Sequence, residues 1–309
     1  MERLSFRYQT VPLGASSDVT NPNPGKIEWD LQTITFLTSM VFQLTTLVIS
    51  AISLAQSGEP NPAPPLLIVV VTMELVVQCV EILWYGIVGA LYYFGQLSIG
   101  VRYRYYDWAI TTPVGLTGLI IFVWYLECQS ATTDILGEGS RIAAIVTIIL
   151  MDYLMLFIGY VFEAEYEFRG WLNRAMNWLP LKPGNGPQAD LKYSLYAYRG
   201  VFLGWLPFLG IFIPMFIALG TAKPSENSPW GYAFFTVLTT FVTWGLYGVV
   251  ALVFRSPEQA KMKNASYNVL DIVSKNIVGL VTSIVALNLS NPSGGATPWN
   301  ATVCNATSA

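Results

Sequence analysis

The sequence predicts an all-α integral membrane protein, built as a bundle of seven transmembrane helices. Of its 309 residues, 53% are hydrophobic and only 11% are charged, whereas a soluble domain carries about a quarter charged residues. The mean hydropathy is +0.49. Seven stretches are apolar over about the 20 residues that a helix needs to cross a bilayer.

Each expected span is bounded by residues that break or end helices. Pro, Gly, Asn and Ser dominate the separators SGEPNPAPP at 57–65, LPLKPGNGP at 179–187 and AKPSENSP at 222–229, and RSPEQAKMKN follows at 255–264. The expected spans, in chain order, are 31–55, 66–94, 103–126, 141–163, 199–220, 230–254 and 265–288.

We expect one helical domain at 31–290, preceded by a polar N-terminal arm at 1–30. The tail at 291–309 is rich in Ser, Thr and Gly, and such a composition is typical of disorder. The longest connection, 164–198, contains EFRGWLNRAMNWL, in which aromatic and basic residues are mixed. That mixture predicts a short amphipathic helix on the membrane surface.

Composition excludes several classes of function. The chain has no histidine, which excludes a histidine-based catalytic triad and most zinc sites. Its three cysteines have no metal-ligand spacing, and its net charge of -3 indicates no nucleic-acid partner. We therefore expect neither a metal site nor an enzyme.

Lysine and arginine predict the orientation, because they gather on the cytoplasmic side of membrane proteins. Only Arg141 and Lys223 fall on the side that holds the C-terminus. That side also carries the sequons at Asn300 and Asn305, as well as Cys128 and Cys304, which a lumenal or external compartment would allow to be glycosylated or to form a disulfide. The N-terminus is thus expected in the cytoplasm. The opposite side holds Arg3, Arg7, Lys26, Arg102, Arg104, Arg169, Arg174, Lys182, Lys192, Arg199, Arg255, Lys261 and Lys263.

A charge inside a bilayer is costly and is a functional hypothesis by default. Lys275 lies near the midpoint of the last span, and Asp271 lies four residues earlier, on the same face of a helix. A buried lysine beside a carboxylate is either a simple ion pair or a Schiff-base lysine with its counterion. The residues of this span leave both readings open. The intramembrane charges are Glu74, Glu81, Asp107, Asp152, Asp271 and Lys275.

The third span adds context through its opening, RYRYYDWAITTP at 102–113. Asp107, Trp108, Thr111 and Thr112 lie within two turns, after Arg104. An aromatic belt at the membrane interface explains the tyrosines of this stretch. It does not explain a carboxylate followed by a buried Thr-Thr-Pro.

At this point the chain resembles the microbial (type 1) rhodopsin family. RYYDWAITTP in the third span, WGLYG in the sixth and LDIVSKNIVG in the seventh occur in the family's order, and the resemblance covers all seven spans. It implies all-trans retinal in the core of the bundle, bound to Lys275, with Asp107 and Asp271 as counterions and Arg104 beside them. The Schiff base that retinal forms with the lysine is a cation and needs carboxylates beside it, whereas the polyene of retinal needs an apolar, aromatic slot.

The resemblance also implies a retinal pocket. In the fourth span, DYLMLFIG places a carboxylate at Asp152, where the family bonds it to the threonine of the third span, and a methionine at Met155. The pocket residues that the resemblance implies are Trp108, Thr111, Thr112, Asp152, Met155, Trp244 and Tyr247.

Three departures bear on what the protein does. An outward proton pump of this family has a carboxylate eleven residues after the acceptor, whereas this chain has Gly118 there. With Tyr85 aligned to the family's second-span tyrosine, Glu74 and Glu81 fall where channelrhodopsins carry glutamates along the ion path, and carboxylates favour cations. The charge bias is inverted, as in heliorhodopsins, which parts of the fourth and fifth spans also resemble.

We therefore expect a light-gated cation or proton channel. The alternatives are a light-driven proton pump, inward if the topology is inverted, and a non-transporting photosensor of the heliorhodopsin type. The expected partners are membrane lipids and the transported cations or protons, and the relatives imply a homo-oligomer.

Overall fold

A computed structural model describes residues 25–56, 65–95, 102–128, 139–163, 189–221, 230–254 and 259–290. Within these ranges, seven helical spans are long and apolar enough to cross a membrane, which confirms the predicted seven-helix bundle. The helices are α1 (Leu31–Gln56), α2 (Pro65–Tyr93), α3 (Arg102–Cys128), α4 (Gly139–Glu163), α6 (Ala189–Thr221), α7 (Trp230–Val253), and the seventh span of α8 (Ala260–Asp271), the π-helix η3 (Ile272–Ile277) and α9 (Val278–Ser290).

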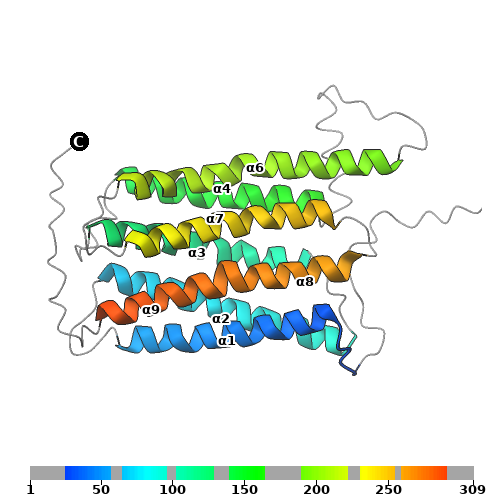
Figure 1. Ribbon diagram of the computed structural model, residues 1–309, viewed down its shortest axis with the longest axis horizontal. Helices are drawn as coiled ribbons and strands as arrows, with labels where there is room; N and C mark the ends of the chain where they lie inside the picture. Colours follow the sequence, from blue (N-terminus) through cyan, green and yellow to red (C-terminus); the bar gives the residue numbers. More distant parts are fainter. Residues whose placement is uncertain are drawn as a thin grey trace, which may run out of the picture.

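The seven spans lie side by side and alternate in direction (Figure 1). Neighbours in the chain pack together from α1 to α7, and the seventh span closes the ring by packing against both α7 and α1. The helix α3 also contacts α6 and α7 across the interior, and 78% of its most apolar window is buried. The third span is therefore the centre of the bundle.

The outer surface of the bundle is apolar, as lipid requires. On α1 the side chains of Val41, Leu44 and Val48 are exposed. The buried residues of the same helix are all polar: Gln32, Ser39, Gln43, Thr46, Ser50 and Ser53. A soluble protein would reverse this arrangement, so the chain is an integral, multi-pass membrane protein whose outer face contacts lipid.

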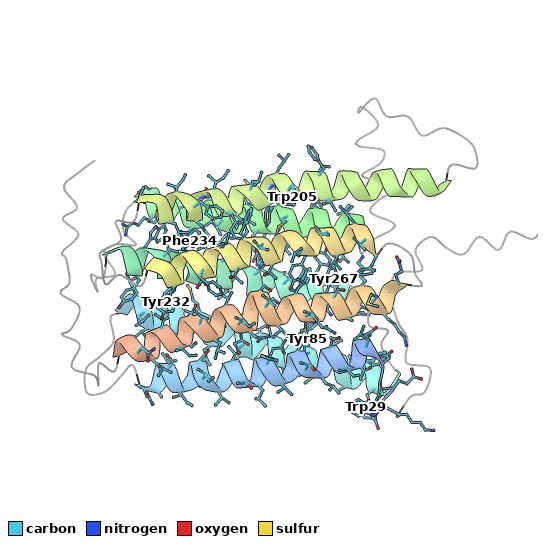
Figure 2. All side chains as sticks on the ribbon, in the orientation of Figure 1. Trp29, Tyr85, Trp205, Tyr232, Phe234 and Tyr267 are labelled. Carbon is cyan, nitrogen blue, oxygen red and sulfur yellow. The ribbon has the colours of Figure 1, made fainter. Side chains whose placement is uncertain are left out.

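Apolar packing is concentrated in two clusters. The larger joins α2, α3, α4, α6, α7 and α9 around fully buried residues such as Ile120, Phe122 and Phe212. The smaller consists of Tyr105, Trp108, Leu156 and Tyr267. In Figure 2, Tyr85 and Tyr267 lie in the half of the bundle nearer Trp29, and Tyr232 and Phe234 lie toward the opposite end.

The fifth span begins earlier than expected. The sequence predicted 199–220, whereas α6 is helical from Ala189. An apolar window finds where a helix enters the bilayer, but the polar residues before it continue the same helix, because backbone hydrogen bonding does not depend on side-chain polarity. The expected surface helix lies in 164–188, outside the described residues, as do the tail, Cys304 and both sequons.

Candidate functional site

Lys275 lies on η3 in the interior of the bundle, where its side chain is 8% exposed. Its Nζ atom forms an ion pair with Glu81 Oε1 of α2. On the other side, Asp107 Oδ2 of α3 lies 3.2 Å from Nζ. Nζ also donates a hydrogen bond to Thr111 Oγ1 at 3.3 Å. The fold thus brings together a lysine and two carboxylates from three helices.

The two carboxylates are almost fully buried, Glu81 at 0% and Asp107 at 2% exposed. Asp107 Oδ1 and Glu81 Oε2 accept no hydrogen bond from the described residues. A buried carboxylate needs a cation and hydrogen-bond donors to offset its desolvation. Here one cation, Lys275, neutralises both carboxylates, and one oxygen of each is left without a hydrogen-bond donor among the described residues.

Asp271 has a different set of partners. Its Oδ2 accepts hydrogen bonds from Tyr85 Oη and Arg104 Nη1, each at 2.5 Å, and its Oδ1 accepts one from Tyr247 Oη at 2.5 Å. Among the described residues, no hydrogen bond or ion pair joins Asp271 to Lys275. The expected direct counterion on the last span therefore contacts the arginine instead.

The two side chains lie on the same face of the last span but at different levels. Lys275 reaches carboxylates of α2 and α3, whereas Asp271, about one turn earlier, reaches Tyr85 of α2 and Arg104 of α3. Between the two residues the helix opens into the π-helix η3. The predicted shared face is therefore present, but each side chain finds its partners at its own level of the bundle.

Arg104 is held from several directions, as the sequence-based role beside the carboxylates requires. Besides Asp271, its guanidinium donates to Tyr85 Oη at 2.9 Å, to Asn264 O at 3.2 Å and to Asn268 Oδ1. A pocket lies on this side of the site, lined by Gln32, Phe36, Trp84, Tyr85, Val88, Tyr103, Arg104, Asn264 and Asn268.

Aromatic side chains provide an apolar environment near Lys275. The ring of Trp108 lies 6.0 Å from Nζ and packs edge to face against Tyr247, with 5.1 Å between ring centroids. Further into the bundle, Trp244 meets Phe212 edge to face at 6.2 Å, and both Trp244 and Met155 pack against the larger core cluster. Lys275 thus has two carboxylates beside it and an indole ring, that of Trp108, close to its amine.

The third and fourth spans are joined by a buried hydrogen bond. Thr112 Oγ1 donates to Asp152 Oδ2 at 2.7 Å, and Asp152 is 0% exposed. The same hydroxyl lies 2.7 Å from Trp108 O, and its single proton serves one acceptor at a time. The predicted pairing of these two residues is therefore present as a contact.

Glu74 lies two turns from Glu81 on α2 and has its own partners. Its Oε1 accepts a hydrogen bond from Gln78 Nε2 at 2.7 Å. The carboxylate also occupies the space that a Cβ atom would need at Gly279 of α9. Only a glycine at that position allows the carboxylate to approach the backbone of α9 so closely.

Sequence reasoning missed a polar seam between α1 and the seventh span. Ser50 Oγ and Ser283 Oγ lie 2.8 Å apart, Ser53 Oγ donates to Ser283 O at 3.1 Å, and Thr46 Oγ1 donates to Asn276 O at 3.4 Å. The signal was available, because the polar residues of the first span recur three or four positions apart from Ser39 to Ser53.

Comparison with known proteins identifies the family. The family model described as Bacteriorhodopsin-like protein matches residues 30–289. No curated protein sequence matches the chain. The similar solved structures include viral rhodopsin OLPVRII, with 23% identity, a TM-score of 0.57, and 83% of this chain and 97% of that chain covered.

Two further structures show the same fold at lower identity. Xanthorhodopsin, described as a light-driven ion pump with dual chromophore, has 16% identity and a TM-score of 0.59, and the match covers 84% of this chain and 93% of that one. The light-driven proton pump of Coccomyxa subellipsoidea has 15% identity and a TM-score of 0.55, with 85% and 99% covered. The chain therefore belongs to the bacteriorhodopsin-like family of type 1 rhodopsins, as a divergent member, and this membership implies a light-activated membrane protein with a retinal chromophore bound to a lysine.

Proposed function

We propose that the protein is a light-gated cation or proton channel, with all-trans retinal attached covalently to Lys275. Retinal, bound there as a Schiff base, supplies the absorption of light and a change of shape on isomerisation. The described residues fit this group, because the buried lysine has two carboxylates beside it and aromatic rings beyond them. Trp108, Tyr247 and Trp244 would line the slot.

The protein's own residues supply the proton chemistry. Asp107 Oδ2, 3.2 Å from Lys275 Nζ, is positioned to accept the proton of that nitrogen. Thr111 Oγ1 at 3.3 Å orients the nitrogen toward it. Arg104 and Asp271 hold each other in place on the side of the pocket described above.

A set of buried, unsatisfied polar atoms supports a channel. Gln43 Oε1 of α1, Gln78 Oε1 of α2, and Asn276 Oδ1 and Nδ2 of η3 have no hydrogen-bond partner among the described residues. Buried amide groups without partners are costly, and in a membrane bundle water is what satisfies them. With Glu74 and Glu81, these groups would line the proposed hydrated path between α1, α2 and the seventh span, and such a lining suits cations.

A light-driven proton pump is the second candidate. It is favoured by the likeness to structures that are themselves described as light-driven pumps. Against it, the position eleven residues after Asp107 is Gly118, which packs near Met73 and offers no proton donor. A proton pump needs a titratable side chain at this position to return a proton efficiently to the nitrogen of Lys275.

We also propose that the N-terminus is cytoplasmic. Figure 1 shows that α1 and α8 begin at the same end of the bundle, which is the Arg104 side of the site. The positive-inside bias of the sequence assigns this end to the cytoplasm, so transport by a pump would run inward. Epitope tags on the two termini, probed in intact cells, test the assignment, and an externally accessible N-terminal tag would overturn it.

The test of the proposed function is the whole-cell photocurrent at varied voltage. A channel gives a current that reverses sign with voltage, a pump gives a current of constant sign, and a photosensor gives none. Glu81→Gln is expected to change the conductance, and an unaltered current would remove Glu81 from the path.

We also propose that the protein forms a homo-oligomer, as its relatives imply. Cross-linking of the purified pigment tests this proposal.

Two adjacent threonines on α1 allow a matched pair of variants that tests the proposed ion path. The Thr46 hydroxyl is buried and lies 2.9 Å from Phe42 O and 3.4 Å from Asn276 O of the seventh span. Thr45 is exposed, and among the described residues it bonds only to Val41 O of its own helix. Thr46→Val is expected to change the reversal potential or the conductance, and Thr45→Val to leave both unchanged. Equal behaviour of the two variants would argue against a path beside α1.

A further inference from the structure

Two carboxylate clusters lie close together in the core, and each contains one cation. In the first, Lys275 is paired with Glu81 and Asp107. In the second, Arg104 is paired with Asp271. The partition is unexpected, because the sequence assigns Asp271 rather than Glu81 to the lysine.

The hydrogen bonds of Asp271 complete the second cluster. Both of its oxygens accept bonds, from Tyr85 and Arg104 on one oxygen and from Tyr247 on the other. A full guanidinium charge and two hydroxyl donors therefore balance this carboxylate without Lys275.

Glu81 is in the opposite situation. It is 0% exposed, and among the described residues its one charged partner is Lys275, at Oε1, while Oε2 accepts no hydrogen bond. A buried carboxylate with a single partner interacts strongly with that partner, because little water screens the two charges. Lys275 in turn shares its charge between Glu81 and Asp107.

We infer that Glu81 and Asp107 are the two counterions of Lys275, and that Asp271 is a positioning residue that neutralises and orients Arg104. This inference rests on the proposed attachment of retinal to Lys275. It adds to the proposed function, in which Glu81 serves only the ion path. The helices α2 and α3 thereby supply one counterion each.

The absorption maximum measures this role. A carboxylate beside the nitrogen stabilises the cation more in the ground state, where the positive charge lies at the nitrogen, than in the excited state, where it spreads along the polyene. Removing the carboxylate lowers the excitation energy. Glu81→Gln and Asp107→Asn are therefore expected to shift the absorption to longer wavelength, and Asp271→Asn to shift it less than either.

Glu74→Gln is the matched control, because it makes the same change two turns along α2, at a carboxylate bonded to Gln78 rather than to Lys275. Its absorption maximum is expected to stay at the position of the unmodified pigment. An Asp271→Asn shift that equals or exceeds the Glu81→Gln shift would overturn the inference, as would a Glu81→Gln spectrum that matches the Glu74→Gln spectrum.

Glu81→Asp keeps the charge and serves if Glu81→Gln does not form a pigment. Its absorption is expected to lie near that of the unmodified protein, and a shift as large as that of Asp107→Asn would contradict the inference. A second measurement uses the Glu74→Gln pigment labelled with ¹³C at glutamate carboxyl carbons. Light-minus-dark infrared spectra are expected to contain carboxyl bands that move with the label, and bands that respond only to aspartate labelling would overturn the role of Glu81.

These outcomes are separate from the test of the channel. A protein that binds no retinal contradicts the proposed function. A pigment that forms and carries photocurrent, but whose colour is governed by Asp271, contradicts only the inference about Glu81.

Discussion

Arg104 of α3 and Asp271 of α8 form a buried ion pair, with 2.5 Å between Nη1 and Oδ2. The two residues are 167 positions apart in the chain, and the pair joins the central helix to the seventh span. Tyr85 of α2 bonds to both partners, so three helices meet at this point.

Replacing Arg104 by Gln is expected to destabilise the bundle. The substitution leaves Asp271 buried without its cation, and breaking a buried pair in this way costs about 3–5 kcal/mol. Lys261→Gln is the control, because it breaks the exposed pair of Lys261 with Asp30, which contributes about 0–1 kcal/mol. Unfolding of the purified protein in detergent measures both. Equal losses of unfolding free energy in the two variants would show that the buried ion pair contributes no more to stability than the exposed one.

Replacing Lys275 by Arg is expected to abolish the pigment while preserving the fold. Arginine keeps a positive charge between Glu81 and Asp107 but cannot form the covalent link to retinal. Lys263→Arg, made on the same span, should retain the visible band that appears when retinal is added. A coloured Lys275→Arg protein would refute the attachment site.

Replacing Thr112 by Val is expected to slow the return of the protein to its dark state. The bond from Thr112 to Asp152 holds α3 and α4 together in the described structure. Its loss removes about 0.5–1.5 kcal/mol of stabilisation, which corresponds to a roughly 2- to 10-fold longer lifetime if the bond re-forms with closure. Thr117→Val is the control, because within the described part of the chain Thr117 bonds only to Pro113 O of its own helix. Flash photolysis measures the lifetime of the light-activated state. Identical lifetimes in the two variants would show that this hydrogen bond does not control the return to the dark state.

Replacing Gly279 by Ala is expected to displace the carboxylate of Glu74. The added methyl group would meet Glu74 Oε1 and Cδ at distances that no Cβ atom tolerates. The photocurrent of Gly279→Ala should therefore resemble that of Glu74→Gln, and the double variant should show little additional change, because neighbouring residues are not additive. Gly86→Ala adds a methyl group in open space and serves as the control. Full additivity of the two changes would contradict this account.

Asp30, which lies just before α1, is expected to contribute stability that acid removes. Partial burial raises its pKa, but hydrogen bonds from Lys261 and from Thr33 outweigh that effect and hold the pKa below its ordinary value. A carboxyl whose folded pKa is depressed stabilises the fold above its unfolded pKa of about 3.9, and this stability is lost as the pH falls through the folded value. Unfolding measured between neutral and acid pH should therefore show a steeper loss in the unmodified protein than in Asp30→Asn. Parallel curves would exclude Asp30 as a source of acid sensitivity.

Local sequence was sufficient for the spans and for recognising the charges that are buried in the bundle. The apolar runs are as long as a bilayer is thick, and the bilayer forces such runs into helices because no water satisfies their backbone. The same cost of burying charge made Lys275 and Asp107 stand out, and both lie together in the interior. The start of α6 at Ala189 was not predictable in this way. The length of an apolar run indicates how much of a helix lies in the bilayer, and it does not indicate where the helix itself begins.

The partners of each charge were decided only by the tertiary structure. Spacing placed Asp271 beside Lys275, and both side chains do face α2 and α3. They lie about one turn apart, however, so the aspartate meets Tyr85 and Arg104 while the lysine meets two other carboxylates. Glu81 was recognised as an intramembrane charge, yet its contact with Lys275 depends on how α2 lies against the seventh span. Sequence determines which residues must be buried with a partner, because the free energy of burying a charge depends on residue type. Which partner each one finds depends on the packing and rotation of helices that are distant in the chain.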